Sequence, residues 1–321
     1  MSKKILVLGA SGQLGKEVSR LFSSDPSKYE CIAPDEKDAD ITVFSKLSKI
    51  VLDSRPNFVV NCAAFTNVDK AETNAGTVTL INAYGAENAA RASLLVGAAF
   101  IHISTDYVYD GKWNELKYKN PFGYTHKMFV DCEKPLNVYG LSKLEGEKLV
   151  QDRLNEAIPH SYFILRTSGV YGIYGNHFLK KLEIALESDK NKCVQLIADQ
   201  RYCPTSARQL ARQIKVLVDL SPEDRIYTID KVGNVLNAAN LTYESPYLFF
   251  EKYLLMQKKY DLVSRISPIS FDDYFAKHPN AAKRPKDCPL DIELKRVLDL
   301  CEITDTETAL EEYISEVDLK C

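Results

Sequence analysis

The sequence lacks the features that mark several classes of protein. Its 41 Lys and Arg residues do not outnumber its 44 Asp and Glu residues, and the net charge of −3 gives no reason to expect a nucleic-acid partner. No apolar run approaches the length of a membrane span, so we expect no membrane partner. The run after Lys3 and Lys4 is too short for a signal peptide and leads into glycines instead of a cleavage site.

The eight cysteines form no C-x-x-C pair, and several of them lie in apolar runs. We interpret them as reduced and mostly buried, which fits a reducing compartment, and we expect no metal site. The sequence has no internal repeat. These absences predict a cytoplasmic protein whose 321 residues form one large or two ordinary domains.

The N-terminal stretch has the order strand, glycine loop, helix. Residues 4–8 are a short, β-branched apolar run, and residues 16–22 place apolar side chains at helical spacing. Glycines at such a junction permit a tight turn and close approach to a pyrophosphate, which the N–H groups of the helix then face. The pattern predicts a dinucleotide-binding loop, whose candidate residues are Gly9, Ser11, Gly12, Gln13, Leu14 and Gly15.

Acidic residues follow the next predicted strand, residues 30–33. Asp35 lies where an acid can bind the ribose 2′-hydroxyl of NAD, and no arginine stands beside it to hold a 2′-phosphate. This favours NAD(H) without excluding NADP(H), because Lys37 is near. The alternative is a solvated acidic loop. Asp40, followed by Ile41, is a candidate for contact with the adenine side of the cofactor.

Three further buried strands alternate with helical segments, at residues 58–64, 99–103 and 161–166. This alternation predicts a doubly wound parallel sheet of the Rossmann type in an α/β protein. Hydroxyls and an acid, in the run from Ser104 to Asp106, follow one of these strands, where such sheets bind ligands. Between the strands we expect helices at residues 45–52 and 78–96.

Tyr139 and Lys143 are four residues apart on a predicted helix of residues 139–155. Both side chains therefore share one face, where the ammonium favours the phenolate and lowers the pKa of the tyrosine. A phenol so adjusted is a general acid for proton transfer. The alternative is a surface helix that carries the two residues by chance.

The pattern loosens after Gly172, and we expect a smaller mixed C-terminal lobe that binds substrate. The predicted division is residues 1–169 for NAD(P) binding and 170–321 for the lobe, with about 194–231 returning to the Rossmann core. Within the second half we expect helices at 178–186, 206–218 and 246–259 and strands at 194–197 and 225–229. The long insertion 112–134 has no periodicity, and we expect it to flank the mouth of the active site or an interface.

Several motifs in this chain resemble those of the extended short-chain dehydrogenase/reductases, and within them the dTDP-4-dehydrorhamnose reductases. They are GASGQLG at 9–15, NCAAFTNVDKAE at 61–72, STDYVYDG at 104–111, PLNVYGLSKLEGEK at 135–148, RTSGVYG at 166–172, DQRYCPTSARQLA at 199–211 and RPKDCPLD at 284–291. They occur in the family's order and span residues 4 to about 295.

This resemblance implies hydride transfer from NAD(H) or NADP(H) to the C4 ketone of a nucleotide-linked 6-deoxy sugar. It implies that Tyr139 protonates the carbonyl oxygen, that Lys143 lowers the tyrosine pKa and holds the nicotinamide ribose, and that the Thr105 hydroxyl binds the same oxygen. The remaining positions implied are Ala63, Ala64, Phe65 and Thr66 along the cofactor, and Asp106, Gly169 and Arg284 toward the substrate.

Three departures lie on the substrate side. Gly169 stands where the family commonly has a tryptophan packed against the sugar, Asp287 and Cys288 replace Asn-Ser, and the insertion is longer than usual. They leave open the sugar and the nucleotide. Two alternatives remain: another sugar-nucleotide oxidoreductase or epimerase, and a regulatory β subunit of methionine adenosyltransferase, whose partner would be that enzyme's catalytic subunit. A homodimer is a further expectation.

Overall fold

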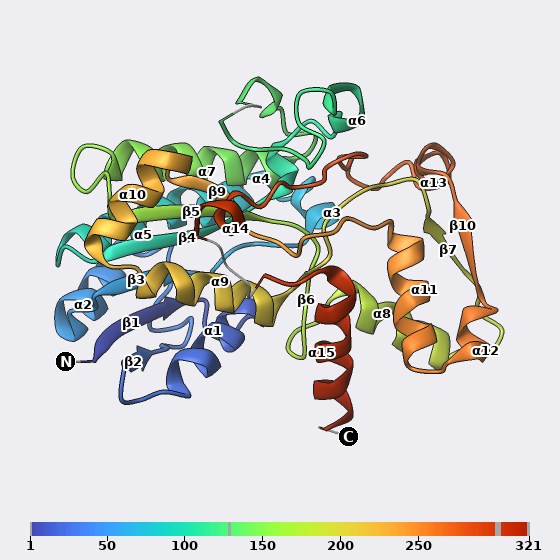
Figure 1. Ribbon diagram of the computed structural model, residues 1–321, viewed down its shortest axis with the longest axis horizontal. Helices are drawn as coiled ribbons and strands as arrows, with labels where there is room; N and C mark the ends of the chain where they lie inside the picture. Colours follow the sequence, from blue (N-terminus) through green and yellow to red (C-terminus); the bar gives the residue numbers. More distant parts are fainter. Residues whose placement is uncertain (1, 128–129, 299–302, 320–321) are drawn as a thin grey trace.

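The structure is a computed structural model that describes residues 2–127, 130–298 and 303–319. Its centre is a parallel sheet of six strands in the order β2-β1-β3-β4-β5-β9 (Figure 1). The strands are β1 Lys3–Leu8, β2 Tyr29–Ile32, β3 Phe58–Asn61, β4 Ala99–Thr105, β5 Tyr162–Thr167 and β9 Val235–Asn237. The predicted doubly wound α/β fold is confirmed.

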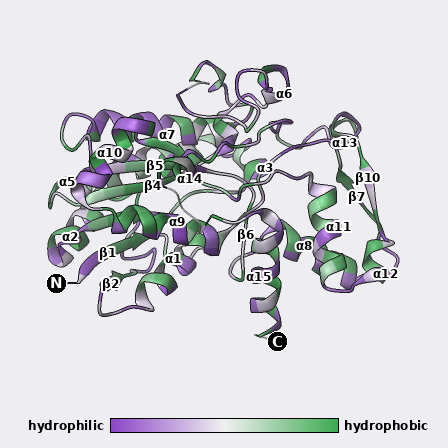
Figure 2. Cartoon of the chain, viewed as in Figure 1, coloured by the Kyte–Doolittle hydropathy of each residue, from purple (hydrophilic) through white to green (hydrophobic). Residues whose placement is uncertain are grey.

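Helices cover both faces of this sheet. Helices α1 (Gln13–Ser23) and α9 (Ala207–Asp219) lie against one face, and α2 (Phe44–Ser54), α5 (Gly85–Leu94) and α7 (Val138–Leu154) lie against the other. Successive side chains of a strand point to opposite faces, so a strand covered on both sides is apolar along most of its length. Figure 2 shows this apolar colouring along β4 and β5 at the centre of the molecule.

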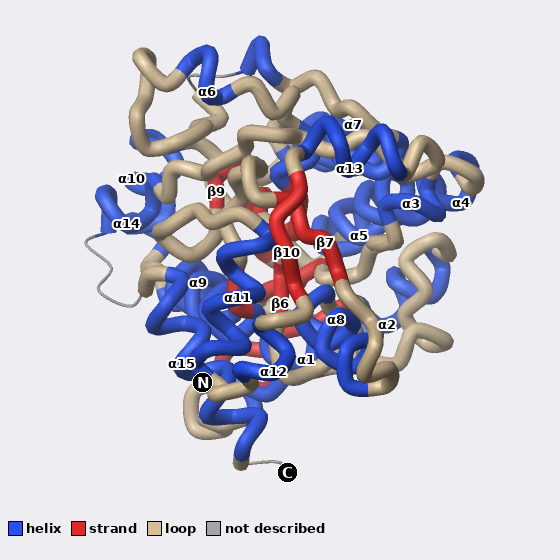
Figure 3. Tube along the Cα trace, turned by 90° about the vertical axis from the view of Figure 1, so that its right-hand side faces the viewer, coloured by secondary structure: helices blue, strands red, loops and turns tan. Residues whose placement is uncertain are grey.

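The second half of the chain builds a smaller mixed lobe. Strands β7 (Val194–Ile197) and β10 (Ile266–Ile269) pair in parallel, and they run side by side in Figure 3. A separate apolar core joins them to the helices of the lobe. The helices in this core are α8 Phe178–Glu187, α11 Pro246–Met256, α12 Tyr260–Val263 and α15 Thr306–Asp318. Helix α13 (Phe271–Lys277) follows β10 and has no buried residue. Strands β6 (Val170–Tyr171) and β8 (Thr205–Ser206) pair between the lobe and the sheet.

The predicted strand at 225–229 is wrong, because these residues belong to α10 (Pro222–Val232). Ser221 caps this helix by accepting a hydrogen bond from the backbone of Asp224, and Pro222 occupies a first-turn position. The strand that joins the sheet is β9, and α14 (Glu293–Leu298) packs beside α10. Residues 194–197 pair within the lobe, so the segment that returns to the sheet begins with α9 and ends with β9.

The predicted helix 78–96 is helical but not uniform. It consists of α4 (Ala75–Thr79), a π-helical turn (Leu80–Tyr84) and α5. Such turns are rare and occur frequently at functional sites. Here the turn directs Asn82 toward α7, where its amide donates to Ser142 Oγ at 3.0 Å. Helix α7 approaches closely because Gly146 has no side chain: a Cβ there would lie 2.3 Å from Asn82 O.

The insertion 112–134 is packed against the segment 287–292 and contains the short helix α6 (Trp113–Leu116). Trp113 and Tyr124 are buried, and Tyr124 stacks on Tyr109 with ring centroids 4.4 Å apart. Asn237 Nδ2 on β9 donates to the backbone carbonyl of Tyr124 at 2.6 Å. Deleting residues 113–129 would uncover this core, and we therefore expect the deletion to lower the stability of the fold. Phe129, at the end of this segment, lies outside the described residues.

Candidate active site

In the glycine loop, residues 9–15, the backbone segments lie too close together for side chains at two of the glycine positions. Gly9 has φ of +72°, and a Cβ there would lie 2.6 Å from Ala63 N, while a Cβ on Gly15 would lie 2.1 Å from Gly9 O. Helix α1 begins at Gln13, and its N-cap Gly12 has no side chain to occupy the first-turn N–H groups. Ser11 and Leu14 flank these positions. A side chain at Gly9 or Gly15 would fill the turn, so the loop fits the pyrophosphate of a dinucleotide.

The end of β3 lies beside this loop, because Leu8 and Asn61 are partners in the sheet. Asn82 fixes the chain that follows: its Oδ1 accepts from Phe65 N at 2.8 Å and its Nδ2 donates to Phe65 O at 3.1 Å. Ala63 and Ala64 are thereby held at the carboxyl edge of the sheet, and Thr66 next to them is exposed. The structure brings these predicted residues together.

The acidic residues after β2 differ from one another. Asp35 is exposed. Asp40 is engaged locally, since its Oδ1 accepts from the backbone N–H and the hydroxyl of Thr42 at 2.9 and 2.7 Å, and these bonds lower its pKa. Ile41 is buried, and Asn88 Nδ2 donates to its carbonyl at 3.1 Å. Asp35 therefore has the more accessible carboxylate.

Thr105 and Tyr139 meet at the carboxyl end of β4. The Thr105 hydroxyl lies near the Tyr139 phenol, and Tyr107 packs edge-on against Tyr139 with ring centroids 5.6 Å apart. The Thr105 hydroxyl also accepts from Tyr107 N and donates to Asp106 Oδ1, each at 3.2 Å. The hydroxyl and the phenol can therefore address one carbonyl oxygen together.

The expected lowering of the tyrosine pKa is wrong for this structure. Burial raises the pKa of Tyr139 to about 12, although the nearby Thr105 hydroxyl opposes the shift. Burial also lowers the pKa of Lys143 to about 8, against the field of Glu147 and Cys62. The Lys143 nitrogen is 2.6 Å from Ile103 O and 3.2 Å from His102 Nε2. Desolvation therefore outweighs the attraction that sequence spacing suggested.

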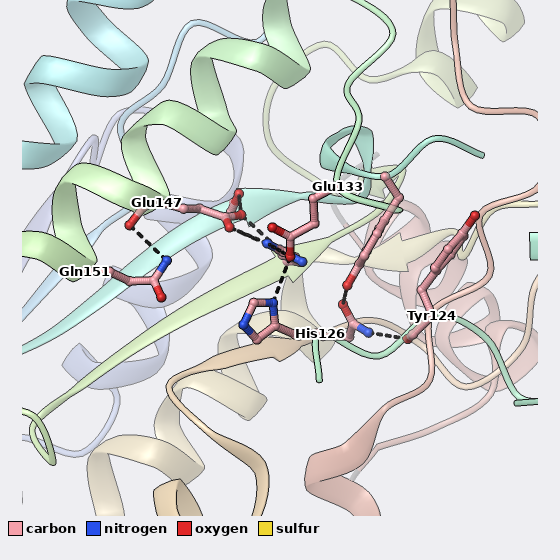
Figure 4. Close-up of polar contacts among 9 residues, drawn as sticks. Tyr124, His126, Glu133, Glu147 and Gln151 are labelled. Atoms are coloured by element: carbon pink, nitrogen blue, oxygen red, sulfur yellow. Dashed lines mark hydrogen bonds and ion pairs between the residues drawn. The ribbon is translucent and has the colours of Figure 1, made fainter. Parts of the chain in front are cut away.

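A charged cluster supports this site from inside. Glu147 on α7 receives bonds from Arg166 on β5, with a shortest distance of 2.5 Å, and from the hydroxyl of Ser104. Arg166 also pairs with Glu133 at 2.8 Å, and His126 Nδ1 lies 2.8 Å from the same carboxylate oxygen (Figure 4). The cluster therefore holds β4, β5, α7 and the insertion together. Its member on β4 is Ser104, which immediately precedes Thr105.

A cavity of about 450 Å³ adjoins Asp106 and extends into the lobe. Asp106, Tyr107, Ser168 and Gly169 form its sheet side, and α8, β7 and the segment 284–285 form other walls. Asp106 Oδ2 accepts from Ser168 Oγ at 2.6 Å, yet burial raises the pKa of Asp106 to about 7. Arg284 faces the cavity and pairs with Asp69 at 3.0 Å.

The space beside Gly169 is already filled. A Cβ at Gly169, which has φ of +51°, would lie 2.4 Å from the ring of Tyr202. A tryptophan at position 169, which the family commonly has there, would therefore find no free room in this structure. Tyr202 lines the cavity, and its buried hydroxyl has no hydrogen-bond partner among the described residues. Sequence reasoning also missed Asn61, His102 and Ser168, since each matters through a contact with a distant residue.

Fold and site together define an extended short-chain dehydrogenase/reductase: a doubly wound sheet, a glycine loop, and Thr105, Tyr139 and Lys143 at the same edge. Comparison with known proteins narrows this class. The sequence model described as the RmlD substrate binding domain matches residues 3–319. The chain belongs to this family, that of the dTDP-4-dehydrorhamnose reductases.

Individual relatives agree with that membership. The chain is 32% identical over 293 residues to a dTDP-4-dehydrorhamnose reductase of Aggregatibacter actinomycetemcomitans, covering 90% of each chain. The solved reductase of Bacillus anthracis, in complex with NADP, is 32% identical with a TM-score of 0.82 and covers 98% of this chain and 100% of its own. A UDP-glucose 4-epimerase of Thermotoga maritima, 16% identical with a TM-score of 0.72 over 99% of both chains, shares the fold alone.

In the part of the chain that the structure describes, no helix is both long enough and apolar enough to span a membrane. The same residues contain no cluster of three or more His, Cys, Asp or Glu side chains suited to a metal ion.

Proposed function

We propose that this protein is an NAD(P)H-dependent reductase of a nucleotide-linked 4-keto-6-deoxy sugar, most similar to dTDP-4-dehydrorhamnose reductase. One observation carries the proposal. The Thr105 hydroxyl lies near the Tyr139 phenol at the sheet edge that also bears the glycine loop, and Asp106 next to them lines the 450 Å³ cavity. Family membership supports the same reaction.

The cofactor supplies a hydride when it is bound. The glycine loop, comprising Gly9, Ser11, Gly12, Gln13, Leu14 and Gly15, would hold its pyrophosphate at the start of α1. Residues 63–66 would line its nicotinamide half, Asp35 would bind the adenosine ribose, and Asp40 and Ile41 would lie toward the adenine. The Bacillus anthracis relative was solved in complex with NADP. In this chain, the grounds for proposing an NAD(H) preference are Asp35 and the absence of a neighbouring arginine.

The chain's own residues would handle the carbonyl oxygen. Thr105 would donate a hydrogen bond that orients the ketone, and Tyr139 would transfer its phenolic proton to the oxygen as the hydride reaches the carbon. The ketone would become an alcohol by gaining one hydride, which the bound dihydronicotinamide would supply, and one proton from Tyr139. Lys143, one helical turn from Tyr139, would contact the nicotinamide ribose.

Substrate recognition would fall to the cavity. Asp106, Gly169 and Arg284 contribute to its walls, and Tyr202 covers Gly169. The Tyr202 ring lines the cavity and offers the sugar an aromatic surface. We therefore place the sugar beside Tyr202. Gly169 has no side chain with which to contact it.

The substitution Tyr139→Phe tests the proposal. It removes one oxygen and keeps nearly the same volume, so we expect NADPH and NADH affinity to stay within a few-fold. Loss of a positioned general acid costs about 10²- to 10⁴-fold in turnover. Wild type and variant are compared by calorimetry with each cofactor and by steady-state reduction of dTDP-4-dehydrorhamnose. An unchanged turnover rate would exclude Tyr139 as the acid.

The regulatory alternative makes a different prediction. A subunit that only binds a dinucleotide would reduce no keto sugar nucleotide, would bind a methionine adenosyltransferase catalytic chain, and would lose little in Tyr139→Phe. Wild-type turnover on any such sugar decides against it.

Assembly, location and domain division remain proposals as well. We propose a homodimer, and a cytoplasmic location that agrees with the free state of all six cysteines among the described residues. We also propose that residues 1–169 hold the cofactor and that the lobe from residue 170 covers the substrate, with the α9–β9 segment attached to the sheet.

A further inference from the structure

Lys143 ends a buried chain of polar groups that begins at the backbone N–H of Ala63, after β3. Asn61, His102 and Lys143 are each at most 1% exposed. Asn61 closes β3, and His102 is its partner on β4, so the two side chains share the face that α7 covers. The consecutive distances are 3.1 Å from Ala63 N to Asn61 Oδ1, 3.2 Å from Asn61 Nδ2 to His102 Nδ1, and 3.2 Å from His102 Nε2 to Lys143 Nζ.

The direction of this chain is fixed at its first link. The backbone N–H of Ala63 can only donate, so the group that it meets must be the Asn61 oxygen. This leaves the Asn61 NH₂ group facing His102, and an amide NH₂ group can only donate as well. His102 Nδ1 must therefore carry no proton, and a neutral imidazole then carries its proton on Nε2.

The last link decides the state of the lysine. His102 Nε2–H points at Lys143 Nζ, so the lysine nitrogen has to accept. An ammonium group has no lone pair, whereas an amine has one and can still donate to Ile103 O at 2.6 Å. Every group in the chain is satisfied only when Lys143 is a neutral amine.

We propose that Asn61 and His102 are positioning residues that stabilise the neutral amine of Lys143 and so restrict when this lysine takes up a proton. To charge Lys143, His102 would need its proton on Nδ1, opposite the Asn61 NH₂ group. Asn61 would then have to turn over and leave Ala63 N–H without an acceptor. The protonation of Lys143 is thereby coupled to the backbone that borders the proposed cofactor site.

The surroundings agree with this assignment. Glu147 on α7 and Cys62 after β3 favour the charged form of Lys143, but Glu147 is already bound to Arg166, and burial still lowers the pKa of Lys143 to about 8. Burial and the nearby lysine also hold the pKa of His102 well below its ordinary value, as a neutral ring requires. The catalytic consequence rests on the proposed reductase function; the protonation state does not.

The first experiment uses the wild-type protein without cofactor. Nitrogen-15 NMR of lysine-labelled protein follows Lys143 Nζ against pH, with the signal assigned by its loss in Lys143→Met. We expect a midpoint near pH 8, far below the 10.5 of free lysine. Histidine-labelled protein should show His102 as the Nε2–H tautomer, assigned by its loss in His102→Gln. A midpoint at 10.5, or an Nδ1–H tautomer, would overturn the proposal.

The second experiment reverses the chain with one isosteric change, Asn61→Asp. The new carboxylate can still accept from Ala63 N–H, and its other oxygen accepts from His102 Nδ1–H, which leaves Nε2 free to accept from an ammonium. We expect the Lys143 midpoint to rise by about one pH unit or more, a tenfold gain in proton affinity. The His102 tautomer should change with it.

The matched control is Asn57→Asp, at the opposite end of β3. Asn57 is exposed and also accepts a backbone N–H, from Lys4 at 2.7 Å, so this variant adds the same charge without touching the chain. It should leave the midpoint unchanged. An equal rise in both variants, or none in Asn61→Asp, would contradict the proposal. If Asn61→Asp does not fold, the wild-type tautomer decides.

Activity separates this proposal from the proposed function. In a working reductase, the limb of the turnover–pH profile that follows Lys143 should move upward in Asn61→Asp by the shift that NMR measures. If the wild type reduces no keto sugar, the function fails while the NMR result still stands. If it reduces the sugar but the limb stays in place, the positioning role of Asn61 fails alone.

Discussion

Helix α7 covers two buried polar clusters, one around Lys143 and the other, a turn further along, around Glu147. In the second cluster a full charge is kept in the interior, because Arg166 meets Glu147 at 2.5 Å and Glu133 at 2.8 Å. In the first, each link is a single bond of about 3 Å between groups that can all be neutral. The central residues of both clusters are buried, yet only the second cluster contains its own counter-charges.

This difference separates two tasks. An ion pair with opposing charges on both sides holds its protonation state over a wide pH range and ties strands and helix together. A neutral chain that ends in a lysine at the edge of the site can change state when a ligand or a proton arrives. We infer that Glu147 and Arg166 maintain the geometry of α7, whereas Asn61 and His102 control the protonation state of Lys143.

The largest expected effect comes from breaking the charged cluster. The change Arg166→Met leaves the fully buried Glu147 without its cation, and removal of one partner of such a pair typically destabilises a protein by about 3–5 kcal/mol. Urea unfolding at neutral pH measures the loss. In the control Lys28→Met, the exposed lysine pairs with Asp25 at the surface, and such surface pairs typically contribute about 0–1 kcal/mol. Equal losses would remove the distinction between buried and exposed pairs.

The next effect tests whether the first cluster carries a charge. A lysine with a pKa of about 8 in the folded state and 10.5 when unfolded binds fewer protons in the folded state between these values. Stability then rises with pH across this window, by about 3 kcal/mol for this one group. In Lys143→Met this rise should disappear, so the difference in unfolding free energy between variant and wild type should depend on pH.

The measurement is urea unfolding of both proteins from about pH 8 to about pH 10.5. Other groups that titrate in this range cancel in the difference, and the unpaired His102 N–H shifts the variant equally at every pH. A difference that stays constant would mean that Lys143 enters the folded protein with its ordinary pKa.

The sequence predicts the parts of this site that depend on local spacing. The strand, the glycines and the start of α1 are contiguous, and Tyr139 and Lys143 are one helical turn apart, so periodicity is enough to place them. It also predicts that residues 63–66 and Thr105 lie at one edge, since parallel strands share their carboxyl ends.

Contacts between distant residues lie beyond that reasoning. Tyr202 occupies the space above Gly169, and Asn61 faces His102 only because of the register between β3 and β4. The pKa of Tyr139 depends on burial, which spacing does not reveal. The wrong strand at 225–229 arose from its β-branched residues, while the deciding signal, Ser221 followed by Pro222, lay just upstream.

The smallest expected effect concerns the outer member of the charged cluster. Glu133 is the link from Arg166 to His126 in the insertion, and Glu133→Gln keeps an oxygen that Arg166 can still bind while Glu147 retains the ion pair. We expect a loss of about 1 kcal/mol at neutral pH, the net value of one typical hydrogen bond. Although burial opposes it, pairing with His126 and Arg166 lowers the pKa of Glu133 below 4.5, so this stabilisation is present above pH 4.5 and falls away as the carboxylate is protonated at lower pH. The free energies of unfolding of the wild type and Glu133→Gln, measured with urea, should therefore converge as the pH falls below 4.5.

The exposed Glu115 of the same insertion provides the control. We expect the stability of Glu115→Gln to stay within about 0.5 kcal/mol of wild type, both at neutral pH and below pH 4.5. A loss in Glu133→Gln as large as that in Arg166→Met would mean that the insertion, and not the pair inside the sheet, holds the cluster together.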